Sequence, residues 1–134
     1  MVEEALNEDS LGRITYDEEK SLLRLEWLEA TKDIIAPHFQ GILYLLAGYG
    51  LQKKPKNIFV DARKFLFHPS NELVGPWRTK NISPLYNEAG VEKFAFLYPL
   101  GSVVPSTNGQ NMPDEKFPTG FFTSESELNE WLST

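Results

Sequence analysis

The sequence predicts a single α/β domain: a mostly parallel central sheet, an antiparallel hairpin at its N-terminal side, and helices packed against it. Three observations predict this class. The chain has 134 residues, 41% hydrophobic and 24% charged, which is the balance of one globular domain with a real core. Near the N-terminus, apolar residues alternate with polar ones, as in strands with one buried face. Further on, short apolar runs alternate with segments of helical period, an order that favours parallel strand pairing.

The first predicted elements are an acidic lead-in over residues 1–11 and a hairpin that opens the domain proper, residues 12–134. The lead-in carries several acidic side chains and only scattered apolar ones, so we expect it to be solvated. Residues 12–16 form the first predicted strand. Residues 21–28 form the second, because Leu23, Leu25 and Trp27 alternate with charged residues.

A long amphipathic helix is predicted next, over residues 36–50. Apolar residues recur there at helical spacing: Ile35, Phe39, Ile42, Leu46 and Tyr49. Pro37 is acceptable only in the first turn, so residues 31–35 are expected to form an approach turn. Gly48 and Gly50 are expected to end the helix.

Two buried strands flank a helical stretch in the middle of the chain. Residues 58–60 are apolar without alternation, which predicts a central strand, and residues 94–98 form the second. Between them, Pro76 and Pro84 forbid one continuous helix. We expect two helical pieces, residues 71–81 and 83–89, with Gly90 as the stop.

The C-terminal part is predicted to be a long loop, a short strand and a helix. Residues 100–118 are polar and interrupted by Pro and Gly, and a loop of this length is often functional. Residues 120–122 form the strand. Ser124 and Glu127 have the spacing of a capping box, and Leu128, Trp131 and Leu132 give the helix its apolar stripe.

Charge and composition narrow the function classes. The formal net charge is -6 and the sequence pI is about 4.9, which disfavours binding to a phosphate backbone. The absence of cysteine removes disulfides, thiolate nucleophiles and Cys-ligated zinc. The first residues do not have the pattern of a signal peptide, and no apolar run reaches membrane-spanning length. We therefore expect a cytoplasmic protein without a membrane span.

Several stretches together resemble the SpoIIAA-like branch of the STAS superfamily, small bacterial α/β domains akin to anti-sigma-factor antagonists. The resemblance covers roughly residues 12–132. Its carriers are residues 25–28, the strand end at residues 60–63, Trp77, residues 84–95 and residues 122–132. It implies a STAS-like sheet and places Ser70 where those relatives carry a phosphorylated serine. The relatives' Asp-Ser-Ser-Gly run is replaced here by residues 69–72, Pro-Ser-Asn-Glu.

The candidate site lies in the loop after the central strand. Its predicted partner-binding or regulatory residues are Asp61, Arg63, Phe65, Phe67, His68 and Ser70. Each has a structural alternative. Asp61 could be a ligand-binding acid, or a strand terminator that caps backbone amides or pairs with Arg63. Ser70 could be a regulatory site or simply a helix N-cap, and Phe65 and Phe67 in a loop favour an interaction surface.

The leading functional hypothesis is a non-catalytic STAS-like module that binds a protein partner. The alternative is a domain that binds a small apolar molecule or a lipid. In that case some aromatic side chains would line a pocket instead of filling the core, and the candidates are Phe65, Phe67, Trp77, Tyr86, Phe94, Phe96 and Tyr98. A hydrolase built from Ser70, His68 and Asp61 is the remote alternative, because no nucleophile elbow is present. No metal or cofactor is expected, since only two histidines occur, and homodimerisation is a further expectation.

Overall fold

The structure is a computed structural model that describes residues 3–105 and 109–134. Along the chain its elements are β1 (Glu3–Glu8), β2 (Gly12–Asp17), β3 (Leu22–Trp27), a 3₁₀ turn (Glu29–Asp33), α1 (Ala36–Lys53), β4 (Asn57–Asp61), α2 (Asn71–Val74), α3 (Pro76–Asn81), α4 (Ser83–Ala89), β5 (Lys93–Leu97), β6 (Gln110–Asn111), β7 (Pro118–Phe122) and α5 (Glu125–Leu132). The predicted α/β class is confirmed.

The strands of the described residues form one seven-stranded sheet in the order β1-β2-β3-β4-β5-β7-β6. Strands β3, β4, β5 and β7 are parallel to one another. The predicted hairpin is present as the antiparallel pair β2 and β3. Because β1 and β6 add further antiparallel pairs at the two edges, the sheet is mixed rather than mostly parallel.

Residues 1–11 were expected to be an acidic lead-in, of which residues 1–2 lie outside the described part of the chain and residues 3–8 form the edge strand β1 instead. All six residues are exposed or half-buried, as expected of a solvated segment. Their backbone nevertheless pairs with β2, with an irregularity between Ala5 and Asn7. The hydroxyl of Tyr49 on α1 also donates a hydrogen bond to the carbonyl of Leu6, 2.9 Å away. Backbone pairing, which needs no apolar side chains, therefore overrides the weak strand pattern.

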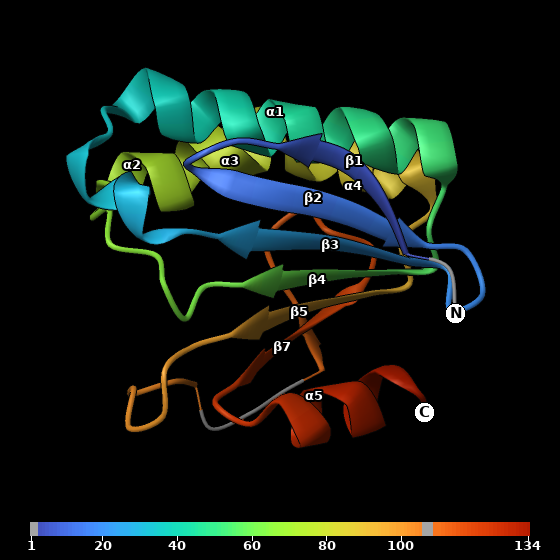
Figure 1. Cartoon of the computed structure of the whole chain (residues 1–134). Helices are drawn as coiled ribbons and strands as arrows, with labels where there is room; N and C mark the ends of the chain where they lie inside the picture. Colours follow the sequence, from blue (N-terminus) through green and yellow to red (C-terminus); the bar gives the residue numbers. More distant parts are fainter. Residues whose placement is uncertain (1–2, 106–108) are drawn as a thin grey trace.

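The two faces of the sheet carry different helices (Figure 1). Helix α1 and the α2–α4 segment cover one face, and α5 covers the other. Side chains of a strand alternate between faces, so Ile58 and Val60 of β4 join the core under α1 while Phe59 joins the core under α5. All five residues of β4 are buried, as predicted for the central strand.

Helix α1 starts where predicted and ends later. Pro37 lies in its first turn, and the helix runs to Lys53, with Lys54 in the left-handed conformation at φ 48°. The glycines expected to end it lie inside the helix. Gly50 is buried, and a Cβ atom there would lie 3.9 Å from Ala89 and 4.0 Å from Ile58. These are ordinary van der Waals distances, so Gly50 faces α4 and the sheet without a contact that would require glycine.

The segment after the central strand has three helical pieces where two were predicted. A break at Gly75 separates α2 from α3, and a second break at Ile82 precedes α4. Pro76 and Pro84 each occupy a first-turn position, where the missing N–H costs no helical hydrogen bond. Gly90 ends α4 at φ 81°, as predicted.

Candidate ligand-binding pocket

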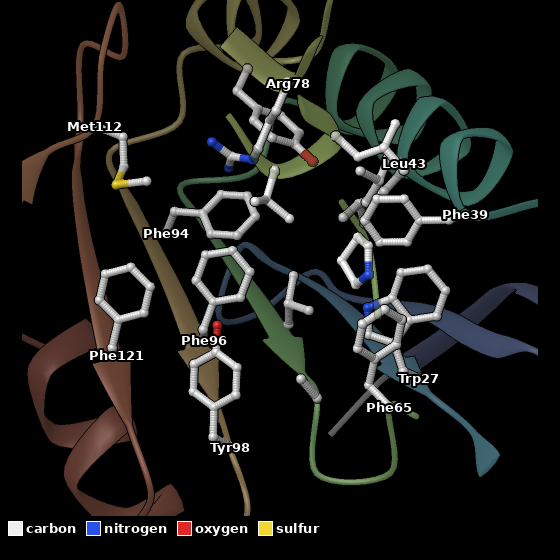
Figure 2. Close-up of a pocket in the computed structure, with 17 residues that line it drawn as sticks. Trp27, Phe39, Leu43, Phe65, Arg78, Phe94, Phe96, Tyr98, Met112 and Phe121 are labelled. Atoms are coloured by element: carbon white, nitrogen blue, oxygen red, sulfur yellow. The ribbon is translucent and has the colours of Figure 1, made fainter. Parts of the chain in front are cut away.

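A pocket of about 310 Å³ opens between α1, the α2–α4 segment and the carboxyl ends of the parallel strands (Figure 2). Seventeen residues line it. Eight are aromatic: Trp27, Phe39, Phe65, Tyr86, Phe94, Phe96, Tyr98 and Phe121. The others are Leu43, Leu46, Val60, Ala62, Pro69, Leu73, Val74, Arg78 and Met112. We call this site the aromatic pocket. The carboxyl ends of strands are where open α/β sheets generally bind ligands.

The strand period explains which side chains reach the aromatic pocket. Phe94, Phe96 and Tyr98 follow one another at every second residue of β5 and its extension, so all three lie on the same face. Their rings form a row, with centroids 5.0 Å apart between Phe94 and Phe96 and 6.1 Å apart between Phe96 and Tyr98. Phe121 of β7 stacks on Phe96 at 5.5 Å with 9° between the ring planes. The rings of Phe96, Tyr98 and Phe121 thus form a nearly flat aromatic wall, and the Phe94 ring is tilted by 39° from that of Phe96.

The opposite wall combines a second aromatic cluster with leucines of α1. Trp27, at the end of β3, lies 5.7 Å from Phe39 of α1 and 4.7 Å from Phe65 of the loop, measured between ring centroids. Leu43 projects from α1 into the pocket one turn beyond Phe39 (Figure 2). Both walls are therefore apolar, and the site excludes polar ligands that cannot recover their lost hydration.

Arg78 of α3 is the one charged residue among the described side chains that line the pocket. Its guanidinium carbon lies 5.4 Å from the centroid of the Phe94 ring and 5.8 Å from that of Tyr86, both within cation–π range. Arg78 Nη1 donates to Oε2 of Glu115, whose side chain is completely buried. Ser83 Oγ donates to the same oxygen at 2.6 Å. The positive charge at the pocket is therefore balanced from behind by a buried carboxylate.

Two tyrosines of the pocket stay uncharged at neutral pH. Burial raises the pKa of the Tyr86 hydroxyl, and the nearby charge of Arg78 only partly opposes this rise. Burial raises the pKa of the Tyr98 hydroxyl in the same way. Both side chains thus present neutral phenols to whatever occupies the pocket.

Asp61 does not face the pocket. It lies on the opposite face of β4 from Val60, and its side chain is 4% exposed. Arg63 donates to it from its backbone N, from Nε at 3.0 Å and from Nη2 at 2.7 Å, and Arg24 donates at 3.1 Å. Burial opposes ionisation, but these bonds and charges outweigh it, so the pKa of Asp61 lies below its ordinary value. The geometry matches the structural alternative, a strand terminator paired with Arg63.

The two loop phenylalanines turn inward, whereas their position in a loop predicted that they form an exposed interaction surface. Both Phe65 and Phe67 are half-buried. Phe67 lies 5.4 Å from Phe39 and 6.2 Å from Phe65 between ring centroids. Thr31 holds the loop in this position, because its hydroxyl accepts a hydrogen bond from Leu66 N at 2.9 Å. Of the predicted site residues, only Phe65 contributes to the aromatic pocket.

His68 and Ser70 are exposed and are not joined to Asp61 by a hydrogen bond within the described chain. Ser70 Oγ accepts a hydrogen bond from Leu73 N at 3.3 Å and caps α2. This is the N-cap role predicted as the alternative to a regulatory site. The carboxylate of Asp61 is already bound to Arg24 and Arg63. The three residues of the remote hydrolase hypothesis are thus not assembled in this arrangement.

Sequence reasoning missed Arg78, Glu115 and Met112. The alternation of Phe94, Phe96 and Tyr98 was a usable signal that was not used, although these residues were among the aromatics named as possible pocket-lining side chains. Arg78 and Glu115 lie 37 residues apart and carry no motif, so only the fold brings them together. Met112 comes from the long loop that was suspected of a function, which thereby supplies one residue of the pocket.

The described residues contain no cluster of three or more His, Cys, Asp or Glu side chains placed to hold a metal ion. None of the described helices is both long and apolar enough to cross a membrane. Comparison with family models finds no matching family, and comparisons with curated proteins and with solved structures find no match either. The fold and site together define an α/β domain with an aromatic pocket at the carboxyl end of its parallel strands.

Proposed function

We propose that this protein binds a small, largely apolar molecule in the aromatic pocket. The observation that carries the proposal is the lining itself: sixteen of the seventeen residues are apolar or neutral aromatic, with Arg78 as the exception. Ligand sites in proteins are typically concave, mostly apolar and supplied with few polar groups. A pocket of about 310 Å³ has the volume of about ten water molecules, taking about 30 Å³ for each. It suits a compact ligand of one or two rings, or a short branched chain.

The expected affinity follows from the surface such a ligand loses to the pocket. A two-ring molecule buries about 250 Å², the upper end for a large aromatic side chain. At about 25 cal/mol per Å² this contributes about 6 kcal/mol, which sets a lower limit on the dissociation constant in the tens of micromolar, because the cost of association is still to be subtracted. Stacking on the flat wall formed by Phe96 and Phe121 would favour planar ligands further.

The test is a titration with 6-propionyl-2-(dimethylamino)naphthalene, an uncharged two-ring probe whose fluorescence changes in apolar sites. We expect saturable binding of one probe per chain. A Leu43→Trp variant fills the pocket from α1 and should weaken binding at least tenfold. Leu45→Trp is the matched control, because Leu45 is a half-buried leucine of the same helix that does not line the pocket. Absence of saturable binding, or equal binding by the Leu43→Trp variant, would refute the function.

A protein-binding module remains the second candidate, and it stays a prediction. Its support is the exposed part of the loop after β4, where Leu66 is 43% exposed between Phe65 and Phe67. The side chains of Arg63, His68 and Ser70 are also exposed there. The inward packing of the two phenylalanines removes the largest apolar groups from that surface, so we place ligand binding first.

A further inference from the structure

We infer that the aromatic pocket selects an uncharged ligand and that Glu115, which lies behind Arg78, sets this preference. The inference rests on the ligand-binding function proposed above and adds the chemical class of the ligand. An arginine in an apolar pocket ordinarily indicates an anionic ligand, since a guanidinium pairs readily with carboxylates and phosphates. The surroundings of Arg78 lead to the opposite conclusion.

The charge of Arg78 is partly matched inside the protein, while its Nη2 is buried without a hydrogen-bond partner among the described residues and can donate to an uncharged acceptor such as a carbonyl. Its Nη1 donates to Glu115 Oε2, and its side chain is 13% exposed while that of Glu115 is fully buried. Ser83, itself buried, donates to the same carboxylate oxygen. The Arg78–Glu115 ion pair is thus formally neutral, and of the two residues only Arg78 lines the pocket.

A ligand carboxylate in the pocket would meet this formally neutral pair. Its attraction to Arg78 is opposed by its repulsion from Glu115, because the two side chains are in direct contact. The pair therefore acts on the pocket as a dipole, whose field is weaker than that of a free guanidinium. This weakened attraction compensates less of the cost of removing the anion from water. The formal net charge of -6 adds a weak repulsion of the same sign.

The other polar groups of the pocket agree with an uncharged ligand. The hydroxyls of Tyr86 and Tyr98 are neutral donors, and the aromatic faces around Arg78 stabilise its cation without needing a bound anion. A neutral ligand loses little hydration on entry. The pocket therefore favours neutral over anionic molecules of the same shape.

Two naphthalene derivatives with equal numbers of non-hydrogen atoms test this inference at pH 7. One is 2-acetylnaphthalene, which is neutral, and the other is 2-naphthoate, which is an anion. Isothermal titration with the wild-type protein should show at least tenfold tighter binding of the neutral probe. In Glu115→Gln the side chain keeps its shape and an acceptor for Ser83 but loses its charge, so Arg78 becomes an uncompensated cation. We expect the preference for the neutral probe to fall at least tenfold in this variant.

Glu125→Gln is the matched control. It removes one carboxylate from an ion pair, the 3.3 Å contact with Arg63, but Glu125 does not line the pocket. Its selectivity should equal that of the wild type. Thermal unfolding of each variant, followed by circular dichroism, establishes that it is folded.

The outcomes separate the two proposals. If neither probe binds the wild type, the ligand-binding function itself fails. If the wild type binds 2-naphthoate as tightly as 2-acetylnaphthalene, the function stands and the selectivity is refuted. If folded Glu115→Gln keeps the wild-type preference, Glu115 does not set it. Should that variant not fold, the two probes on the wild-type protein still decide whether the pocket prefers a neutral ligand.

Discussion

Replacing Gly120 by alanine should destabilise the protein by crowding the contact between β7 and α5. A Cβ atom at this position would lie 2.6 Å from Phe122 Cε2 and 3.0 Å from Trp131 Cζ3. Carbon atoms pack best at about 3.5–4.0 Å, so the Phe122 ring must move by about 1 Å. That ring is 7% exposed and packs against Trp131 at 5.6 Å between ring centroids, which leaves it little room.

The expected magnitude combines two opposing effects. Overpacking a well-packed core costs about 1–3 kcal/mol. Alanine has less conformational freedom than glycine in the unfolded chain, which stabilises the folded protein by about 0.5 kcal/mol or somewhat more. We expect a net loss of about 1.5 kcal/mol, which for a domain of this size corresponds to a fall in Tm of about 6 °C. Thermal unfolding and urea titration with an unchanged m value would measure it.

Gly48→Ala is the control, because a Cβ atom at Gly48 meets nothing within 4 Å on the exposed side of α1. That substitution should raise stability by about 0.5–1 kcal/mol, as expected for glycine in a helix interior. A double-mutant cycle identifies the cause. Phe122→Leu removes the nearest ring atoms, so Gly120→Ala should cost less in that background than in the wild type. If Gly120→Ala unfolds within about 1 °C of the wild type, the reasoning from the close contact is refuted.

Two further predictions concern polar groups that hold the loop after β4. Asp61→Asn should lower stability by about 2 kcal/mol at pH 7, the loss expected for hydrogen bonds to charged groups. The folded-state pKa of Asp61 lies below its ordinary value of 3.8. The stabilisation that the Asp61 carboxylate gives the folded protein is therefore present above pH 3.8 and is lost as pH falls through the folded-state pKa. The gap between wild type and variant in urea midpoint should therefore narrow from pH 7 to pH 3, and a constant gap would contradict this. Thr31→Val leaves the backbone N–H of Leu66 without its acceptor and should lower the free energy of unfolding by about 2 kcal/mol. Thr31→Ser keeps that acceptor and is the control. Equal stability of the two variants in urea titration would count against the role of this hydroxyl.

Much of the fold could be predicted because local pattern and burial agree. The alternation of Leu23, Leu25 and Trp27 places three side chains on one face, and all three are buried under α1. The cap at Ser124 is present, with its hydroxyl accepting from Glu127 N at 3.3 Å. The predicted end of α4 at Gly90 is also confirmed, because Gly90 has the left-handed backbone conformation that is common after the last turn of a helix.

The misses have physical reasons that lie outside local sequence. Strand β1 has little apolar pattern, and it forms because β2 offers a free edge for backbone pairing. The end of α1 was placed at Gly48 and Gly50, yet the helix continues to Lys53 and the left-handed residue that follows it is Lys54. The sequence did not predict which residues line the pocket, because the strands, helices and loops that form it are brought together only by the tertiary structure. Tertiary context overrides local preference in each case.

The acidic edge of the sheet has a consequence for self-association. Strand β1 ends the sheet on one side and carries Glu3, Glu4 and Glu8, all exposed, with Glu4 paired to Lys53 and Glu8 to Arg13. A second copy pairing edge to edge would bring two such rows of carboxylates together, and like charges on facing strands repel. The charge of this edge therefore disfavours extension of the sheet into a neighbouring molecule through β1. We expect a homodimer to use a different surface.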